Sequence, residues 1–363
     1  MAEGQATVKE KRSWSAFYEA WLFDGCALQT CALLRVGFGL LVLVYGLVWL
    51  RDAQFWFSNQ GVVSVETITA NQPATMWSIF FWVEPNPGFV TICLTIMLLN
   101  AVLLTLGCFG QLQAAFIFFW LVSFQNRNSL IGDGEDSVFR LFAFFLIWMP
   151  LDRCYSVTRL LEPIASSIPK RSEAAWAIRL VQIQMAIIYL SAACSKMLSP
   201  TWQDGSAVYY VYQMHDNFGR GPLPAFLMET EWLIRLTTWG AMLTEASLPF
   251  LLFLPRTRRA GIALGFLLHL SMEYSMHLFL FQWIMMLGLL AFTKPEDFNW
   301  FRRWTPKPDP YQADPLPQRS MLALPGPKTS NEPLEMEEIE ESVGGVTSED
   351  DFIDVEPERS HSR

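Results

Sequence analysis

Eight apolar runs account for most of the chain up to residue 293. About 20 apolar residues are needed to cross a bilayer as an α-helix. The runs cover residues 28–50, 88–108, 111–125, 137–151, 176–196, 233–254, 260–276 and 277–293. The third and fourth are short, and the last two are nearly continuous. We therefore predict an all-α, polytopic transmembrane bundle of about eight helices.

The composition also indicates a membrane protein. Of the 363 residues, 52% are hydrophobic and 17% are charged, a balance typical of membrane proteins. The formal charge of −9 describes the tail more than the bundle, because twelve of the 35 acidic residues lie between Glu332 and Glu358. Nothing resembles a basic nucleic-acid surface, so no nucleic-acid partner is predicted.

The cysteines give no sign of a disulfide framework, a thiol redox motif or a metal site. They lie in or beside apolar runs, without a CxxC pair or regular spacing. They are Cys26, Cys31, Cys93, Cys108, Cys154 and Cys194. The first 14 residues are polar and lead into no signal-peptide pattern, so we expect the first apolar helix to stay in the membrane.

Basic residues predict the orientation through the positive-inside rule. With eight helices, four clusters fall on one face, and few lysines or arginines lie on the other. The clusters are Lys9, Lys11 and Arg12; Arg153, Arg159, Lys170 and Arg171; Arg256, Arg258 and Arg259; and Lys294, Arg302 and Arg303. We therefore predict a multi-pass protein of the cell membrane, with both termini cytoplasmic.

This orientation divides the chain into three parts. Residues 1–19 form a cytoplasmic N-terminal segment, and residues 20–300 form the membrane domain, with outer segments at about 51–87, 126–136 and 197–232. From 301 the chain is rich in proline and then acidic, a composition that predicts a disordered cytoplasmic tail.

The stretch "SAACSKMLSPTWQDGSAVYY" ends an apolar helix on a lone lysine, Lys196. A lysine at a helix end can simply extend its ammonium to the headgroups. Alternatively, desolvation can hold the amine neutral, and a neutral amine is a competent base. In the second interpretation Trp202 and Tyr209 supply walls and Asp204 a countercharge.

Two further groups of polar residues lie at the predicted outer face or inside the bundle. The loop "FQNRNSLIGDGEDSVFR" contains more amides and carboxylates than a turn requires, although turn formation explains some of them. The stretch "LLHLSMEYSMHLFLFQW" places His269, Glu273 and His277 four residues apart. His269 and His277 would be about 12 Å apart on a regular helix, too far to share one metal ion. We predict a polar stripe inside the bundle, with Glu273 hydrogen bonded to a neighbour.

Two charged residues lie within predicted spans. Glu245 is near the middle of the sixth and Arg35 is inside the first. Either would be costly alone in lipid, so each is expected to face the bundle interior and find a partner.

Three blocks together resemble a known family. "FQNRNSLIGDGED", "IYLSAACSKMLSPTWQDGSAVYY" and "LLHLSMEYSMHLFLFQWIMM" are similar, in order and separation, to the horizontally transferred transmembrane (HTTM) domain. This bacterial family is similar to the membrane portion of vitamin K-dependent gamma-carboxylase.

The resemblance implies a chemistry. In the carboxylase, a reduced quinone reacts with oxygen to give a strong base that removes a γ-proton from glutamate, and the carbanion captures carbon dioxide. Lys196 matches the lysine that starts this reaction, and Asn128 matches an asparagine that stabilises charge. The next position departs from the pattern, because Ser129 stands where the carboxylase has histidine.

The predicted site follows from these residues. Lys196, Asn128 and Asp204 are the candidate catalytic residues. The candidate substrate or quinone pocket contains Arg127, Asp133, Glu135, Asp136, Trp202, Tyr209, Tyr210, His269 and Glu273. The predicted cofactor is a reduced, vitamin K-like quinone with oxygen and carbon dioxide, and no metal. The predicted partners are the lipid bilayer, the lipid-soluble quinone and a separate protein substrate.

Three functions remain open from the sequence. The first is a carboxylase-like, carbon-carbon lyase type of enzyme that depends on a quinol. The second is a non-catalytic membrane protein that binds a lipid, a quinone or a partner protein, which Ser129 favours. The third is a solute transporter with Glu245, Arg35 and the His269 stripe along its path.

Overall fold

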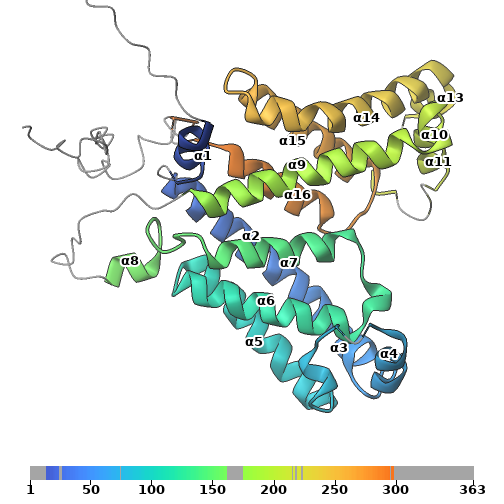
Figure 1. The fold of residues 1–363 in the computed structure, drawn as a ribbon. Helices are drawn as coiled ribbons and strands as arrows, with labels where there is room; N and C mark the ends of the chain where they lie inside the picture. Colours follow the sequence, from blue (N-terminus) through green and yellow to red (C-terminus); the bar gives the residue numbers. More distant parts are fainter. Residues whose placement is uncertain are drawn as a thin grey trace, which may run out of the picture. The chain divides into compact units, whose positions relative to one another are not determined.

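The computed structural model describes residues 14–23, 27–73, 75–161, 175–214, 216, 219–221, 224–294 and 296–297. All of them belong to the first of two units, Met1–Trp304 and Thr305–Arg363. These residues form helices and connecting turns, with no strand among them (Figure 1). The predicted tail, 301–363, and the first 13 residues of the predicted N-terminal segment lie outside the described residues.

Each predicted membrane run contains a helix, which confirms the all-α bundle. The helices are α2 (Leu28–Arg51), α5 (Pro87–Leu106), α6 (Gly110–Arg127), α7 (Gly134–Ile147), α9 (Trp176–Met197), α14 (Glu231–Phe253), α15 (Arg258–Ser275) and α16 (Phe281–Leu289), which η3 (Leu290–Phe292) continues. By length and composition, α2, α5 and α9 are long and apolar enough to cross a membrane. The eighth run, predicted from 277, begins its helix only at Phe281.

Short helices lie before and between these. They are α1 (Trp14–Phe23), α3 (Ala53–Phe57), α4 (Val65–Asn71), η1 (Ile79–Phe81), η2 (Ser129–Ile131), α8 (Val157–Leu161), α10 (Pro200–Gln203), α11 (Ala207–Gln213) and α13 (Ala225–Glu229). Seven of these nine helices, all except α1 and α8, belong to the three segments predicted to lie outside the membrane.

Local sequence signals fix two of the helix starts that matter for the site. Helix α5 begins after Asn86, whose side chain accepts from the backbone N–H of Phe89, with Pro87 as its first residue; proline is favoured there because its missing N–H would be unpaired anyway. Helix α7 begins with a capping box. The side chain of Asp133 accepts from the backbone N–H of Asp136, and the side chain of Asp136 accepts from the backbone N–H of Asp133. The start of α7 thus places the carboxylates of Asp133 and Asp136 at one end of the bundle.

The helices pack as two groups that share α16. Helices α2, α5, α6 and α7 follow one another in contact, and α9 packs against α14, which packs against α15. Helix α16 contacts α2 and α7 of the first group and α9 and α15 of the second. Figure 1 shows α16 beside α9, between α14 and α15 on one side and α2 and α7 on the other. Most of the buried apolar side chains form one continuous core along this seam.

Contacts between distant segments tie together the end of the bundle where α14 and η3 finish. The ring of Phe253, at the end of α14, packs on Trp21 of α1 and on Phe292 of η3. The buried guanidinium of Arg35 donates to the carbonyl of Tyr155 at 2.6 Å. Arg35 therefore faces the interior and has a partner, as predicted.

The opposite end is tied together by polar contacts. Buried Arg127, at the end of α6, donates to the carbonyls of Ser58 and Val63 at 2.8 and 2.9 Å. The N–H of Leu280, just before α16, donates to Glu135 at 3.0 Å. The N–H of Gly221 donates to the carbonyl of Tyr274 at 2.9 Å. The bonds of Arg127 join two of the predicted outer segments, 51–87 and 126–136. The other two bonds attach 126–136 to the start of α16 and 197–232 to the end of α15.

Candidate functional site

Lys196 makes an ion pair inside the bundle. Its Nζ lies 2.6 Å from Oε2 of Glu245, across the contact between α9 and α14. The Lys196 side chain is 20% exposed and that of Glu245 is 8% exposed. Trp202, in α10, places its ring centroid 5.1 Å from the same Nζ, which is within range for a cation–π interaction. The predicted partner of Glu245 is thus found, and it is Lys196.

The sequence predicted Asp204 as the countercharge of Lys196, but in the structure Glu245 has this role. Asp204 accepts a hydrogen bond from the N–H of Ser206 at 2.8 Å. Hydrogen bonds from the side chain and backbone of Ser206 lower the pKa of Asp204. The difference arises because Asp204 ends the short helix α10 and stabilises the turn after it, whereas Glu245 faces α9 from the neighbouring helix.

Tyr209 and Tyr210 belong to α11, and their side chains are exposed. Their rings pack edge to face on each other, with centroids 5.6 Å apart. Trp202 is therefore the aromatic residue of this block that touches Lys196.

A hydrogen-bonded triad lies further along the same face of α9. Tyr189 is seven residues, about two helical turns, before Lys196. Its hydroxyl lies 2.8 Å from Nε2 of His269, and Nδ1 of His269 lies 2.5 Å from Oε1 of Gln282. All three residues are buried. Because an amide oxygen only accepts, this arrangement puts the imidazole proton on Nδ1 and leaves Nε2 to accept from Tyr189.

The predicted polar stripe breaks after Glu273. Helix α15 ends at Ser275, so His277 lies outside it, and the regular four-residue spacing does not hold. Glu273 is hydrogen bonded, as predicted: Arg220 and Nε1 of Trp283 both donate to its Oε1. Nη2 of Arg220 also lies 2.8 Å from Nδ1 of His277. Arg220 thus connects the segment after α11 to α15.

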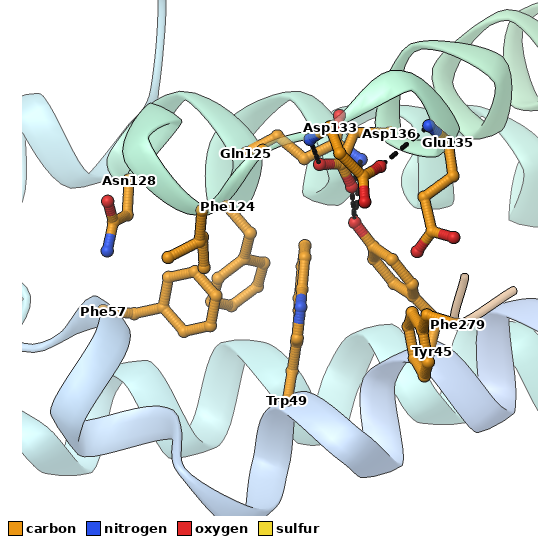
Figure 2. Close-up of a pocket in the computed structure, with 12 residues that line it drawn as sticks. Tyr45, Trp49, Phe57, Phe124, Gln125, Asn128, Asp133, Glu135, Asp136 and Phe279 are labelled. Carbon is orange, nitrogen blue, oxygen red and sulfur yellow. Dashed lines mark hydrogen bonds between the residues drawn. The ribbon is translucent and has the colours of Figure 1, made fainter. Parts of the chain in front are cut away.

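The outer-loop residues surround a second feature, a cavity of about 100 Å³. It is lined by Tyr45, Trp49, Phe57, Phe124, Gln125, Asn128, Ile131, Gly132, Asp133, Glu135, Asp136 and Phe279. We call this the aromatic–acidic cavity. Figure 2 shows Trp49 between Phe57 and Phe124 on one side and Tyr45 and Phe279 on the other. No residue of the Lys196 block lines this cavity, so the structure divides the predicted site residues between two places.

The polar wall of the cavity is a small network. The hydroxyl of Tyr45 donates to Oδ1 of Asp136, and Nε2 of Gln125 lies 3.1 Å from the hydroxyl and 3.2 Å from the carboxylate oxygen. Tyr45 and Trp49 are one turn apart in α2 and were not predicted. Their spacing of four residues in the apolar second half of α2 was the available signal.

Asn128 and Arg127 are held by the protein backbone. Nδ2 of Asn128 donates to the carbonyl of Trp56 at 3.1 Å, and its Oδ1 accepts from the N–H of Leu130 at 3.3 Å. The hydroxyl of Ser129 accepts from Gln72 at 2.7 Å. Among the described residues, no three His, Cys, Asp or Glu side chains group as metal ligands.

The fold and these buried polar centres define a helical membrane protein. The model of the HTTM domain matches residues 23–300 of the sequence. The chain therefore belongs to the HTTM domain family.

Two proteins of Bacillus subtilis (strain 168) are similar to the chain. Sporulation-delaying protein SdpB is 25% identical over 198 residues, which cover 52% of this chain and 60% of SdpB. Uncharacterized protein YitO is 25% identical over 210 residues, which cover 53% of this chain and 65% of YitO. The chain thus spans less than two thirds of either relative. No solved structure matches the chain.

Proposed function

We propose that this chain is a carboxylase-like membrane enzyme in which Lys196 and Glu245 together take up the proton of a reduced quinone. The observation that carries the proposal is the contact of 2.6 Å between Nζ of Lys196 and Oε2 of Glu245. When bound, a reduced quinone would supply, with oxygen, the strong base that the family resemblance implies. Carbon dioxide would be the group added to the carbanion of a separate protein substrate.

The ion pair can act as a base only as a unit. Paired with a carboxylate, Lys196 is an ammonium and has no lone pair to offer. Transfer of one proton from Nζ to Oε2 of Glu245 would leave a neutral amine at Lys196 and a neutral acid at Glu245. The amine can then receive a new proton from a substrate hydroxyl, and Glu245 retains the first.

The surroundings of Lys196 suit an aromatic ligand. The Trp202 ring lies beside Nζ, and the partly exposed side chain of Lys196 leaves the amine accessible. Lys196 lies in the last turn of α9, at the end predicted to be the outer one. A lipid-soluble quinone would reach the site along the bilayer edge.

The test is quinol-dependent oxygen consumption by the purified protein in nanodiscs. Lys196→Met should lower the rate by about 100-fold or more, which is typical for loss of a general base. Glu245→Gln should lower it as well, since it removes the proton acceptor. Asp204→Asn is the matched control and should leave the rate unchanged, because Asp204 is bound by Ser206 and Lys196 pairs elsewhere.

A second candidate is a non-catalytic binding protein of the same fold. It is favoured by the contacts of Asn128 and Ser129, since both side chains are already engaged by the protein. Wild-type protein that binds a quinone without consuming oxygen would support this candidate over the enzyme. A transporter has less support, because Glu245 and Arg35, the charges proposed for its path, are both held by protein partners.

We also propose the multi-pass orientation in the cell membrane, with both termini cytoplasmic. The contacts of Arg258 and Arg259 with Asp297 support it by joining two of the basic clusters at one end of the bundle. Cysteines introduced at Ser206 and at Arg256 test it in intact cells. An impermeant thiol reagent should label the first and leave the second unmodified, and the reverse result would invert the orientation.

A further inference from the structure

The aromatic–acidic cavity is separate from the Lys196 site, and the proposed function does not use it. Five of its lining residues are aromatic, and their rings pack on one another around Trp49. The Tyr45 and Phe57 ring centroids lie 4.1 and 5.0 Å from that of Trp49, and Phe279 stacks on Tyr45 at 5.9 Å. Aromatic faces attract cations, and surrounding rings recognise organic ammonium groups.

The residues that line the cavity include acidic side chains and no basic ones. Asp133, Glu135 and Asp136 line the cavity, and none of the lining residues is Lys, Arg or His. Arg140 lies one turn after Asp136 in α7 and acts on it electrostatically, but it is not among the residues that line the cavity. A buried carboxylate is costly without a countercharge.

The contacts within the protein account for only part of this acidity. Asp133 and Asp136 form the capping box of α7, and Glu135 accepts the N–H of Leu280. These bonds explain why oxygen atoms are needed at the three positions. They supply no positive charge to the cavity.

Among the buried side-chain atoms that the structure describes in this lining, one oxygen of Gln125 has no hydrogen-bond partner. Gln125 is 6% exposed, and its Nε2 donates hydrogen bonds to the hydroxyl of Tyr45 and to Oδ1 of Asp136. Its Oε1 is buried and has no hydrogen-bond partner among the described residues. A buried acceptor left unpaired costs about 1–3 kcal/mol, so the cavity lacks a hydrogen-bond donor.

We propose that the aromatic–acidic cavity binds a primary ammonium group, which places its charge between the aromatic faces and the carboxylates and donates an N–H to Oε1 of Gln125. A quaternary ammonium has no N–H for Gln125. Hard metal ions prefer a shell of oxygen ligands, which the rings do not provide. The volume fits the head of a small amine, since one water occupies about 30 Å³ in the liquid.

Two sources could supply this group. One is a small soluble amine, and the other is the ethanolamine headgroup of a phospholipid. The cavity can be reached from the outer surface, because Gly132 and Asp133 both line it and are exposed. The chemistry of recognition is the same for both sources.

The first experiment needs no variant. Full-length protein in phosphatidylcholine nanodiscs is incubated with radiolabelled methylammonium, and bound label is measured by scintillation proximity. Binding should be saturable and competed by ethanolamine about tenfold better than by tetramethylammonium, because only the former donates N–H bonds. Binding that does not saturate, or that sodium chloride at the same concentration competes equally well, would overturn the proposal.

Variants assign the binding to this cavity. Asp136→Asn and Glu135→Gln each replace an acid with its amide while keeping the shape, and each should weaken binding about tenfold. Asp52→Asn, which changes an exposed carboxylate outside the lining, is the matched control and should bind like wild type. If either cavity variant fails to fold, Phe57→Leu tests the aromatic wall with the charges intact and should also weaken binding. Unchanged affinity in the folded cavity variants would rule the site out.

Lipid composition distinguishes the two sources. In nanodiscs that contain phosphatidylethanolamine, occupancy by the headgroup should lower the apparent affinity for methylammonium about tenfold relative to phosphatidylcholine. Equal affinity in the two lipids would assign the site to soluble amines. Because Lys196 is not involved, Lys196→Met should bind methylammonium normally, so this proposal and the proposed enzyme activity succeed or fail independently.

Discussion

The guanidinium of Arg258 and the carboxylate of Asp297 join the first turn of α15 to the segment after η3. Nη1 of Arg258 lies 2.5 Å from Oδ2 of Asp297, and Nε of Arg259 lies 2.7 Å from Oδ1. The Arg258 side chain is 7% exposed. A buried guanidinium has thus found its countercharge 39 residues away.

Asp297 should make the stability of the folded protein depend on pH. Burial alone would raise the pKa of Asp297, but hydrogen bonds from Arg258, the N–H of Lys294 and Arg259 lower it to about 2. A depressed carboxyl pKa stabilises the fold above the unfolded pKa, and this contribution is lost as pH falls from about 4 to about 2. We expect Asp297→Asn to lower the melting temperature in detergent by about 2–4 °C at pH 7. The difference from wild type should shrink at pH 3, and a constant difference would argue against the pair.

The Lys196–Glu245 pair should show strong coupling in stability. Lys196→Met leaves the carboxylate of Glu245 buried without a partner, which costs about 3–5 kcal/mol for a fully buried pair and less here because Lys196 is partly exposed. The double variant Lys196→Met/Glu245→Leu should recover most of that loss, since it removes both charges. Thermal unfolding of the four proteins of the cycle measures this coupling. Additive losses would mean that the two groups do not interact.

Arg220 should be needed to hold Glu273. The Glu273 side chain is 8% exposed, so Arg220→Met should destabilise the protein by about 1–3 kcal/mol. Arg51→Met is the matched control, because Arg51 is 84% exposed and lies 4.0 Å from Asp52. Exposed pairs contribute little, and the control should unfold like wild type. Equal effects of the two variants would show that the Arg220 contact adds nothing.

Gly107 should tolerate no side chain. Its φ is +73°, in the left-handed region, and a Cβ there would collide with Nη1 of the buried Arg35. Gly107→Ala should therefore cost about 2 kcal/mol or more from strain and displacement of Arg35. The control is Gly240→Ala in α14, where a Cβ meets nothing within 4 Å. That change should stabilise the helix by about 0.5–1 kcal/mol, so thermal unfolding should shift in opposite directions.

The helices could be predicted because each depends on local properties. An apolar run of about 20 residues favours a helix whatever its neighbours are, and the eight runs all contain a helix. Helix α16 begins later than predicted because residues 276–280 connect two helices through an extended turn. Hydropathy alone could not separate that turn from the apolar residues on either side.

Partners could not be predicted in the same way. Glu245 and Arg35 were expected to face the interior because lipid tolerates no lone charge, and both do. Lys196 pairs with Glu245 instead of the predicted Asp204, and this depends on how α14 is rotated against α9. Arg220, Tyr45, Trp49 and Gln125 were missed for the same reason, since nothing near them in sequence shows what they touch.

The sequence by itself determined that this is a helical membrane protein of the HTTM domain family, because hydrophobicity and motif order are properties of the chain alone. Only the tertiary structure decided that the predicted catalytic residues Lys196 and Asn128 lie in different places, the first paired with Glu245 and the second at the aromatic–acidic cavity. The physical reason is that charges and rings act over a few ångströms in space. Helices α2, α6, α7, α9 and α14 and the turn before α16 bring such groups together from positions as far apart in the sequence as Tyr45 and Phe279.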